Sequence, residues 1–325
     1  MRSQSLALVL LGVALGFPLM LLVGRRIEQR AGWIEVRGRV AESGGWSPEN
    51  LEAVVGDELQ LRLTSDDVVH GFAVGQQDAD PIDLDPGRVV ETSLTFTHPG
   101  KYVFYCTRWC GPGHWRMRGT IEVSGPEVQT ALPQTPLYLT LGLDLDVPHP
   151  ADPAPAQRPS ARRGEAISRS LGVDIPSSIT RTQSPVQVWS EWRVLPLSQD
   201  LTDQQLWDLV AFQWQTSTSE RALEQGAALY AANCAACHGE TGGGDGVMAQ
   251  SLLSTPDAGM SVEYDLRAPA DFSDAQAMLG ASPAILQGKI LRGGMGTGMP
   301  YWGPIFTEQQ TWDLVDYLWS FVYDD

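Results

Sequence analysis

The cysteines and the histidines near them are the residues of this chain whose spacing points most directly to chemistry. They form two pairs, Cys106 with Cys110 and Cys234 with Cys237, and a histidine follows each pair closely. Four cysteines are too few to build a disulfide scaffold in a chain of 325 residues. We therefore interpret both pairs as ligands of a metal or cofactor rather than as crosslinks.

The second pair forms the attachment signature of c-type haem. Cys234 and Cys237 stand three positions apart, so that their thiols can reach the two vinyl groups of a haem, and the adjacent His238 can bind the iron. A structural zinc site would need a second pair of ligands, which this part of the sequence does not offer. The sequence therefore predicts one covalent haem c.

The sixth iron ligand is expected from a loop near the carboxyl end. A low-spin haem that carries electrons needs such a ligand, and methionine raises the potential relative to a second histidine. The glycine-rich run over 293–302 resembles the methionine–proline loop of class I cytochromes c, and the resemblance extends over about residues 220–323. It implies Met299 as the ligand, with Met295 as the alternative.

The first pair belongs to a group of soft ligands in one loop. Cys106, Cys110, His114 and Met117 stand at relative positions 0, 4, 8 and 11, and His70 lies 36 residues upstream of the first cysteine. Thiolate, thioether and imidazole ligands together select copper. A mononuclear blue-copper site uses a single cysteine, so the second thiolate favours two coppers that share both sulfurs. A disulfide or a structural zinc site is the alternative, but neither would require the histidines and the methionine.

The stretch from Trp46 to Val123 resembles the binuclear-copper (CuA) domain of subunit II of haem–copper oxygen reductases. It is closest to the B-type branch, whose subunit II has one membrane span. The resemblance implies a cupredoxin Greek-key sandwich whose copper ligands are His70, Cys106, the backbone carbonyl of Arg108, Cys110, His114 and Met117. Many relatives carry Glu or Gln where Arg108 stands, and the Glu also helps to hold magnesium. Arginine cannot do so, and we expect no magnesium through this residue.

The surrounding residues predict one β domain and one α domain. Apolar and polar residues alternate over 58–63 and 90–96, as in half-buried strands, and several such short antiparallel strands predict a β-sandwich over 31–125. Helical periodicity after about residue 200 predicts a mostly α domain over 201–325, and the resemblance of the 293–302 loop implies that this domain is an all-α class I cytochrome c. The Ala/Pro-rich segment 148–160 predicts an extended linker within 126–200.

One sequence repeat complicates this division. Residues 201–214 recur as residues 306–319, with eight of fourteen positions identical. Thr202 and Thr307 each precede an acidic residue and a glutamine in the pattern of a capping box, which predicts two helix starts. The two copies are either two amphipathic helices of one domain or the trace of a duplication. In the second case, 126–200 would include a degenerate, haem-less cytochrome-like segment.

The amino terminus predicts a membrane anchor over residues 1–30. Residues 6–24 carry no charge, and 19 residues in a helix are just long enough to cross a bilayer. A cleaved signal peptide is the alternative. Arg25, Arg26 and Arg30 would place the following domains in the cytoplasm, whereas c-type haem is attached outside it. We follow the haem and predict a single-pass protein of the cell membrane, in contact with lipid, with its soluble domains on the extracytoplasmic or periplasmic side.

Together these patterns predict a multidomain chain with a transmembrane helix, a cupredoxin sandwich and a class I cytochrome c. The resemblance implies a cytochrome c oxidase subunit II that receives electrons from an extracytoplasmic donor at haem c and passes them through CuA to subunit I, where oxygen is reduced. The alternatives are the corresponding subunit of a nitric oxide reductase, a free-standing membrane-anchored shuttle and a copper-delivery protein. The formal charge of −17 argues against a nucleic-acid partner.

Overall fold

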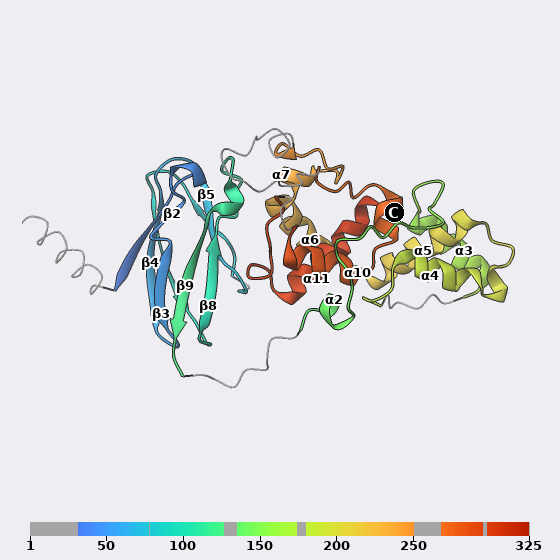
Figure 1. Cartoon of the computed structure of the whole chain (residues 1–325), viewed down its shortest axis with the longest axis horizontal. Coiled ribbons are helices and arrows are strands. Elements are labelled where there is room, and N and C mark those ends of the chain that lie inside the picture. The colour runs from blue at the N-terminus through green and yellow to red at the C-terminus, as the bar shows by residue number, and fades with distance from the viewer. Residues whose placement is uncertain are drawn as a thin grey trace, which may run out of the picture. The chain divides into compact units, whose positions relative to one another are not determined.

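The computed structural model describes residues 32–77, 79–126, 135–173, 180–249, 268–294 and 298–324 (Figure 1). These residues form two compact units, one built of strands and one of helices. No helix in this part of the chain is long and apolar enough to cross a membrane. The span predicted over 6–24 lies outside the described residues.

The strand unit contains two sheets. One sheet has the order β2 (Trp46–Ser47), β1 (Trp33–Gly38), β4 (Glu58–Ser65), β7 (Val89–Thr95). The other has the order β3 (Asn50–Val54), β9 (Arg118–Ser124), β8 (Gly100–Tyr105), β5 (His70–Val74), β6 (Ile82–Leu84). The predicted sandwich is confirmed, but its sheets are mixed rather than antiparallel, because β1 pairs with β4 and β3 with β9 in parallel. Each of these pairs joins strands from separate stretches of sequence, which local patterns cannot predict.

The core of the strand unit follows the alternating pattern. Leu59, Leu61 and Leu63 of β4 are buried, whereas Glu58, Gln60 and Arg62 between them are more exposed. Trp46 packs edge-on against Phe72 and Phe104, with ring centroids 5.8 Å apart in both pairs. Aromatic pairs of this kind add to the free energy gained from burial alone. They hold in place β5, which begins at His70, and β8, which leads into the 106–117 loop.

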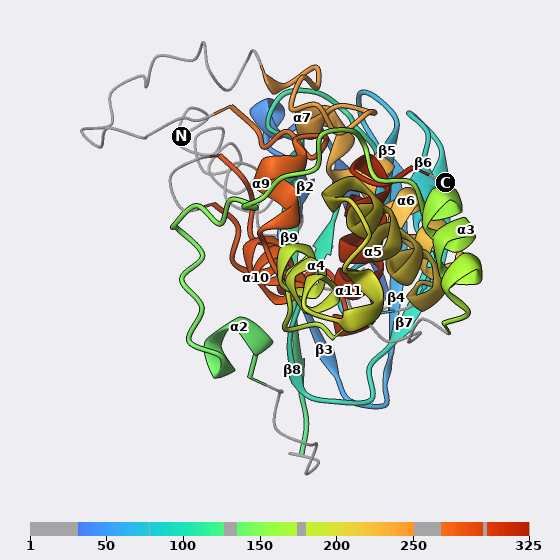
Figure 2. The same ribbon diagram turned by 90° about the vertical axis from the view of Figure 1, so that its right-hand side faces the viewer.

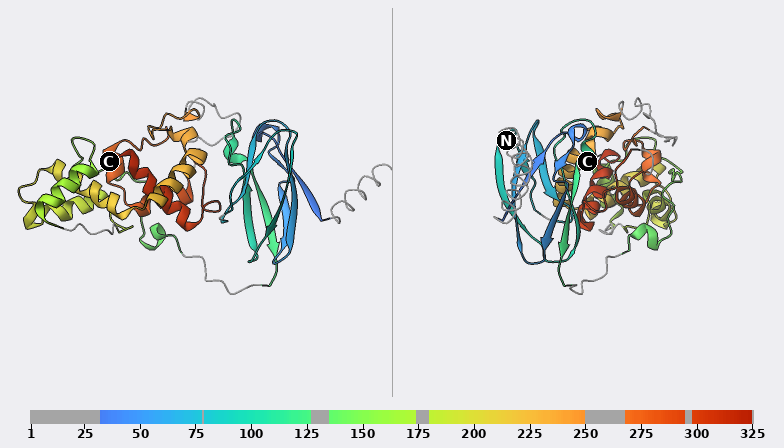
Figure 3. Two further views of the ribbon diagram at one scale, coloured as in Figure 1. Left: turned by 180° about the vertical axis from the view of Figure 1, so that it is seen from behind. Right: turned by 60° about the vertical axis from the view of Figure 1, so that its left-hand side comes forward.

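The helical unit spans the remaining elements, which Figures 1 and 2 show. Its helices are α2 (Leu137–Thr140), α3 (Ala161–Leu171), α4 (Pro185–Arg193), α5 (Asp203–Ser217), α6 (Glu220–Asn233), α7 (Ala235–His238), α9 (Ala275–Leu279), α10 (Pro283–Arg292) and α11 (Glu308–Leu318). Helix α6 packs against α11, and α3 packs against α5. Figure 3 shows the same helices from two further sides.

The segment expected as a linker is partly folded into this unit. Residues 148–160 contain no helix or strand, but α3 and α4 follow within the predicted linker range. Asp208 of α5 accepts hydrogen bonds from the backbone N–H of Ser160 at 2.9 Å and from Arg163 at 2.8 Å. The sequence hid this packing because α3 buries small residues, including Ala161 and Gly164, in place of the large apolar residues that mark an amphipathic helix.

Both predicted capping boxes are confirmed. Thr202 accepts a hydrogen bond from the backbone N–H of Gln205, and Thr307 accepts one from that of Gln310, each at 3.2 Å. In return each glutamine accepts from the backbone N–H of its threonine at 2.8 Å. The two copies of the repeat therefore begin their helices, α5 and α11, in the same way.

Candidate functional site

The predicted copper ligands come together at one end of the strand unit. His70 is the first residue of β5, Cys106 directly follows β8, and Met117 directly precedes β9. The backbone N–H of Cys106 donates to the carbonyl of Met117 at 3.1 Å, which closes the loop between the two strands. His114 lies within that loop, in a short 3₁₀ turn. The sheet therefore fixes both ends of the loop that carries most of the ligands.

The ligand atoms form two neighbouring groups, one around each cysteine. The Sγ of Cys106 lies 3.7 Å from the Nδ1 of His70 and 3.2 Å from the carbonyl oxygen of Arg108. The Sγ of Cys110 lies 3.5 Å from the Nδ1 of His114 and 3.2 Å from the Sδ of Met117. Each sulfur thus lies near an imidazole and near one further atom that can bind a metal.

The two cysteines are free thiols, and their Sγ atoms lie 4.0 Å apart. This arrangement excludes the disulfide alternative in this structure. The hydrogen bond between the thiols lowers the pKa of Cys106 and is also the main cause that raises the pKa of Cys110. A pair in which one thiol ionises more readily than usual is a soft anionic donor, which suits copper.

The structure adds a residue that sequence reasoning missed. The Oδ1 of Asp67 lies 2.8 Å from the Nε2 of His70, so that the Nδ1 of the ring faces Cys106. His70 is fully buried. Burial lowers its pKa, but hydrogen bonds with Cys106 and Asp67 together raise the pKa above the ordinary value. The signal in the sequence was an aspartate three residues ahead of the histidine, which is common enough by chance to carry little weight.

Arg108 offers only its backbone to the ligand group. Its guanidinium pairs with both carboxylate oxygens of Asp83 at 2.7 Å, and the side chain is more than half exposed. Its carbonyl oxygen faces Cys106 instead. Arg108 therefore presents its backbone carbonyl, and not its side chain, to Cys106.

The predicted haem ligands line one cavity of the helical unit, with a volume of about 410 Å³. Cys234 and Cys237 stand on one wall together with His238, and Met299 stands among the lining residues from the loop ahead of α11. Two free thiols, an imidazole and a thioether that face a common space suit a covalent haem with axial histidine and methionine. Met295, the alternative ligand, lies outside the described residues.

His238 is oriented by its surroundings. Its Nδ1 lies 3.1 Å from the carbonyl oxygen of Ala270, and its ring stacks on Phe272 with centroids 4.5 Å apart. Burial lowers the pKa of His238, which favours the neutral imidazole. A neutral ring whose Nδ1 donates to a carbonyl keeps its Nε2 free to bind a metal.

Positive charge at the edge of this cavity was not predicted from the sequence. Lys289 and Arg292 line the cavity, and so does Asp146 from the segment that we expected to be a linker. Arg292 donates to the carboxylate of Asp146 at 2.9 and 2.6 Å. A haem carries two propionates, and these cations suit them.

Arg292→Gln should lower the reduction potential of the bound haem. The change removes a positive charge beside the cavity and leaves the carboxylate of Asp146 uncompensated, and both effects favour the ferric form. A charge interaction of about 1 kcal/mol corresponds to about 40 mV for one electron. A spectroelectrochemical titration of the full-length protein measures the shift. Arg169→Gln, on the exposed surface of α3, is the matched control and should leave the potential unchanged.

A β-sandwich that gathers soft copper ligands, followed by a helical unit whose cavity holds haem-attachment residues, defines a copper- and haem-binding electron-transfer protein. The family of the cytochrome c oxidase subunit II periplasmic domain matches residues 50–124, and the cytochrome c family matches residues 223–321. Cytochrome c oxidase subunit 2 of Thermus thermophilus is 32% identical over 110 residues, which cover 30% of this chain and 81% of that protein. The chain belongs to the cytochrome c oxidase subunit II family and carries a fused cytochrome c domain.

Two further proteins are similar to part of this chain. Cytochrome c oxidase subunit 2 of Artemia franciscana is 39% identical over 67 residues, 21% of this chain and 29% of that protein. The solved periplasmic domain of subunit II of cytochrome oxidase from Bradyrhizobium japonicum is 22% identical and covers 28% of this chain and 83% of that chain, with a TM-score of 0.25.

Proposed function

We propose that this chain is the subunit through which electrons enter a cytochrome c oxidase. It accepts them from an extracytoplasmic donor at its cytochrome c domain and delivers them from its copper domain to subunit I, where oxygen is reduced. The single observation that carries this proposal is that the two cysteines of the 106–117 loop lie side by side, each with a histidine nearby. Membership of the subunit II family does not favour the nitric oxide reductase, shuttle or copper-delivery alternatives.

The copper group that the ligands fit best is binuclear. Cys106 and Cys110 would hold the two coppers together with His70, His114, Met117 and the backbone carbonyl of Arg108. When bound, such a centre exchanges single electrons with little rearrangement of its ligands. The hydrogen bond with Asp67 and the packing of the Trp46 ring would hold the His70 ring in place. A ring held in this way would move little when the charge of the copper centre changes.

The haem group that the cavity fits is a covalent haem c. Cys234 and Cys237 would form the thioether links, and His238 and Met299 would bind the iron. Because c-type haem is attached outside the cytoplasm, both units would lie on the extracytoplasmic side of the cell membrane. Residues 6–24 would anchor them in the lipid as a single span.

We also propose that α3, α4 and α5 are a haem-less copy of α6, α10 and α11. Gly164 of α3 meets the carbonyl of Asp208 in α5, and Gly226 of α6 meets the carbonyl of Asp313 in α11, which stands 105 positions later. Both aspartates are buried, and each accepts a hydrogen bond from the glutamine four residues earlier.

The second helix of each set supports the same correspondence. Helix α4 begins after Ser184 with a proline at its first position, and α10 begins after Ser282 in the same way. The two sets differ where a haem would bind. Between the first and second helices the first set has 172–184, whereas the second has 234–282 with the Cys-Ala-Ala-Cys-His signature.

Gly164→Ala and Gly226→Ala should each lower the free energy of unfolding of the helical unit, and by similar amounts. A Cβ atom on Gly164 or Gly226 would overlap backbone of the facing helix, and overpacking of this kind costs about 1–3 kcal/mol. Calorimetric unfolding of Gly164→Ala and Gly226→Ala measures the effect. Gly243→Ala, whose added Cβ would have only ordinary contacts at 3.5 Å and beyond, is the control. If Gly164→Ala behaved like this control, the proposed equivalence of the two crossings would be wrong.

His114→Ala tests whether electrons leave the haem through the copper domain. The variant should leave the haem reducible by a small reductant, but the assembled oxidase should no longer reoxidise it, because the copper route is broken. Stopped-flow absorbance of the haem in the complex measures the rate, which we expect to fall by orders of magnitude. His98→Ala, at an exposed histidine in a turn, should keep the wild-type rate. Continued fast reoxidation in His114→Ala would show that electrons bypass the copper domain.

A further inference from the structure

A stretch of chain that precedes both helix sets in the sequence lies along the haem cavity. It comprises residues 137–151, which we call the strap: the short helix α2 and the irregular segment that follows it. Helix α2 packs beside α10 (Figures 1 and 2), and farther along the strap Leu145 and Asp146 line the haem cavity. The sequence predicted this stretch to be part of a linker, but it supplies part of the wall of a cofactor cavity.

Leu145 is the apolar residue of the strap at this wall, and it packs directly on the backbone of α10. Its side chain is 2% exposed. A Cβ atom added to Gly288 of α10 would lie only 3.0 Å from the Cδ2 of Leu145 and 2.8 Å from the Cγ of Tyr138. The strap can come this close because residue 288 has no side chain. Little space for water is therefore left between the strap and the helix.

The strap is also fixed beyond Leu145, where it meets α9. The backbone N–H of Ala151 donates to the carbonyl of Gln276 in α9 at 2.7 Å, and Ala151 is 1% exposed. A Cβ atom added to Gly280, which follows α9, would lie 2.0 Å from the carbonyl oxygen of His149. Leu145 thus lies between two anchored stretches of the strap, one on α10 and one on α9. Its position at the cavity wall is therefore fixed from both sides.

We propose that the strap, through Leu145, raises the reduction potential of the haem. Ferric haem carries one more positive charge than ferrous haem, and water stabilises that charge. An apolar side chain that keeps water out of the cavity therefore favours the ferrous state. The strap would thus help to set the driving force for electron transfer to the copper domain. This inference rests on the proposed covalent haem c in the cavity.

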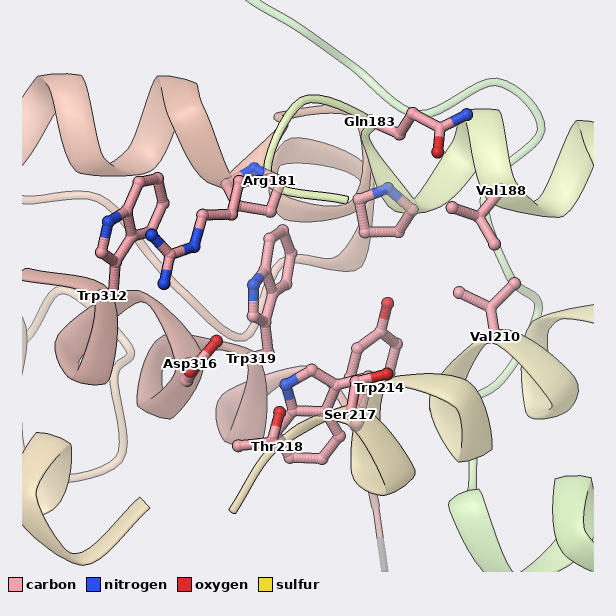
Figure 4. Close-up of a pocket in the computed structure, with 13 residues that line it drawn as sticks. Arg181, Gln183, Val188, Val210, Trp214, Ser217, Thr218, Trp312, Asp316 and Trp319 are labelled. Atoms are coloured by element: carbon pink, nitrogen blue, oxygen red, sulfur yellow. The ribbon is translucent and has the colours of Figure 1, made fainter. Parts of the chain in front are cut away.

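Leu145→Ala should lower the reduction potential of the haem, measured by spectroelectrochemical titration of the full-length protein. The smaller side chain leaves a space at the wall, and water can enter it because Asp146 and Lys289 line the same cavity. Val210→Ala is the matched control, because it also shortens a buried apolar side chain of the helical unit. Val210 lines a second cavity of about 250 Å³ (Figure 4), whose described lining residues all differ from those of the haem cavity. This control should keep the wild-type potential.

Gly288→Ala should lower the potential as well, although Gly288 is not among the residues that line the cavity. The added methyl group would displace Tyr138 and Leu145 and so lift the strap from α10. Hydrogen–deuterium exchange of the full-length protein, followed by mass spectrometry, should show faster exchange in peptides from residues 137–151 of this variant. A lower potential together with a loosened strap would show that the strap itself acts on the haem.

The covalent haem content, measured by the pyridine haemochrome assay, separates this inference from the proposal on which it rests. A wild-type protein that attaches no haem would show that the proposed haem site is wrong. With haem attached, an unchanged potential in Leu145→Ala would overturn the inference alone, and so would an equal fall in Leu145→Ala and Val210→Ala. The inference would also be overturned if Gly288→Ala loosened the strap and left the potential unchanged.

Discussion

Cys110→Ser should reduce the copper content of the full-length protein from two ions per chain to at most one. The Sγ of Cys110 lies beside both His114 and Met117, and a serine hydroxyl is a poor ligand for copper compared with a thiolate. Without the second bridging sulfur, one unpaired electron can no longer be shared by two metals. The purple, valence-delocalised spectrum should give way to that of a single blue or green copper. Metal analysis and electron paramagnetic resonance measure both changes.

Arg108→Ala is the matched control for this experiment. It lies in the same loop, but only its carbonyl faces the ligand group, and alanine keeps that carbonyl. The change removes an exposed ion pair with Asp83, which contributes little to stability. Copper content and spectrum should remain those of the wild type. A single copper, or a zinc ion, in reconstituted wild-type protein would contradict the binuclear assignment.

Met299→Leu should remove the far-red absorption band that marks methionine bound to haem iron. Leucine keeps nearly the same volume in the cavity but lacks the sulfur, so the cavity keeps its shape. The iron should then bind added imidazole or cyanide readily, and the potential should fall because methionine favours the ferrous state. Absorption spectra and a redox titration of the full-length protein measure these effects.

Met278→Leu serves as the control in the same unit. Met278 is buried in α9 and does not line the haem cavity, so the band and the potential should persist. Met295→Leu separates the two sequence candidates. Loss of the band in Met295→Leu, together with its survival in Met299→Leu, would move the axial ligand to residue 295.

Local spacing in the sequence determined most of the two candidate sites. Cys106, Cys110, His114 and Met117 could be recognised because they lie within one loop, and the haem signature because it lies within one turn. The capping boxes at Thr202 and Thr307 could also be recognised from the sequence alone. In each case the interacting groups are close in the chain, so their spacing alone limits how they can meet.

Only the tertiary structure placed the residues that hold these ligands. The backbone just before β5 places Asp67 beside His70. Asp146 binds Arg292 although 146 positions separate the two residues in the sequence. The parallel pairs β1–β4 and β3–β9 and the folded helix α3 also depend on distant partners. Helix α3 buries small residues against α5, a contact made possible by Gly164. The sequence of either segment alone does not show which partner it meets, because the facing surface supplies half of the interaction.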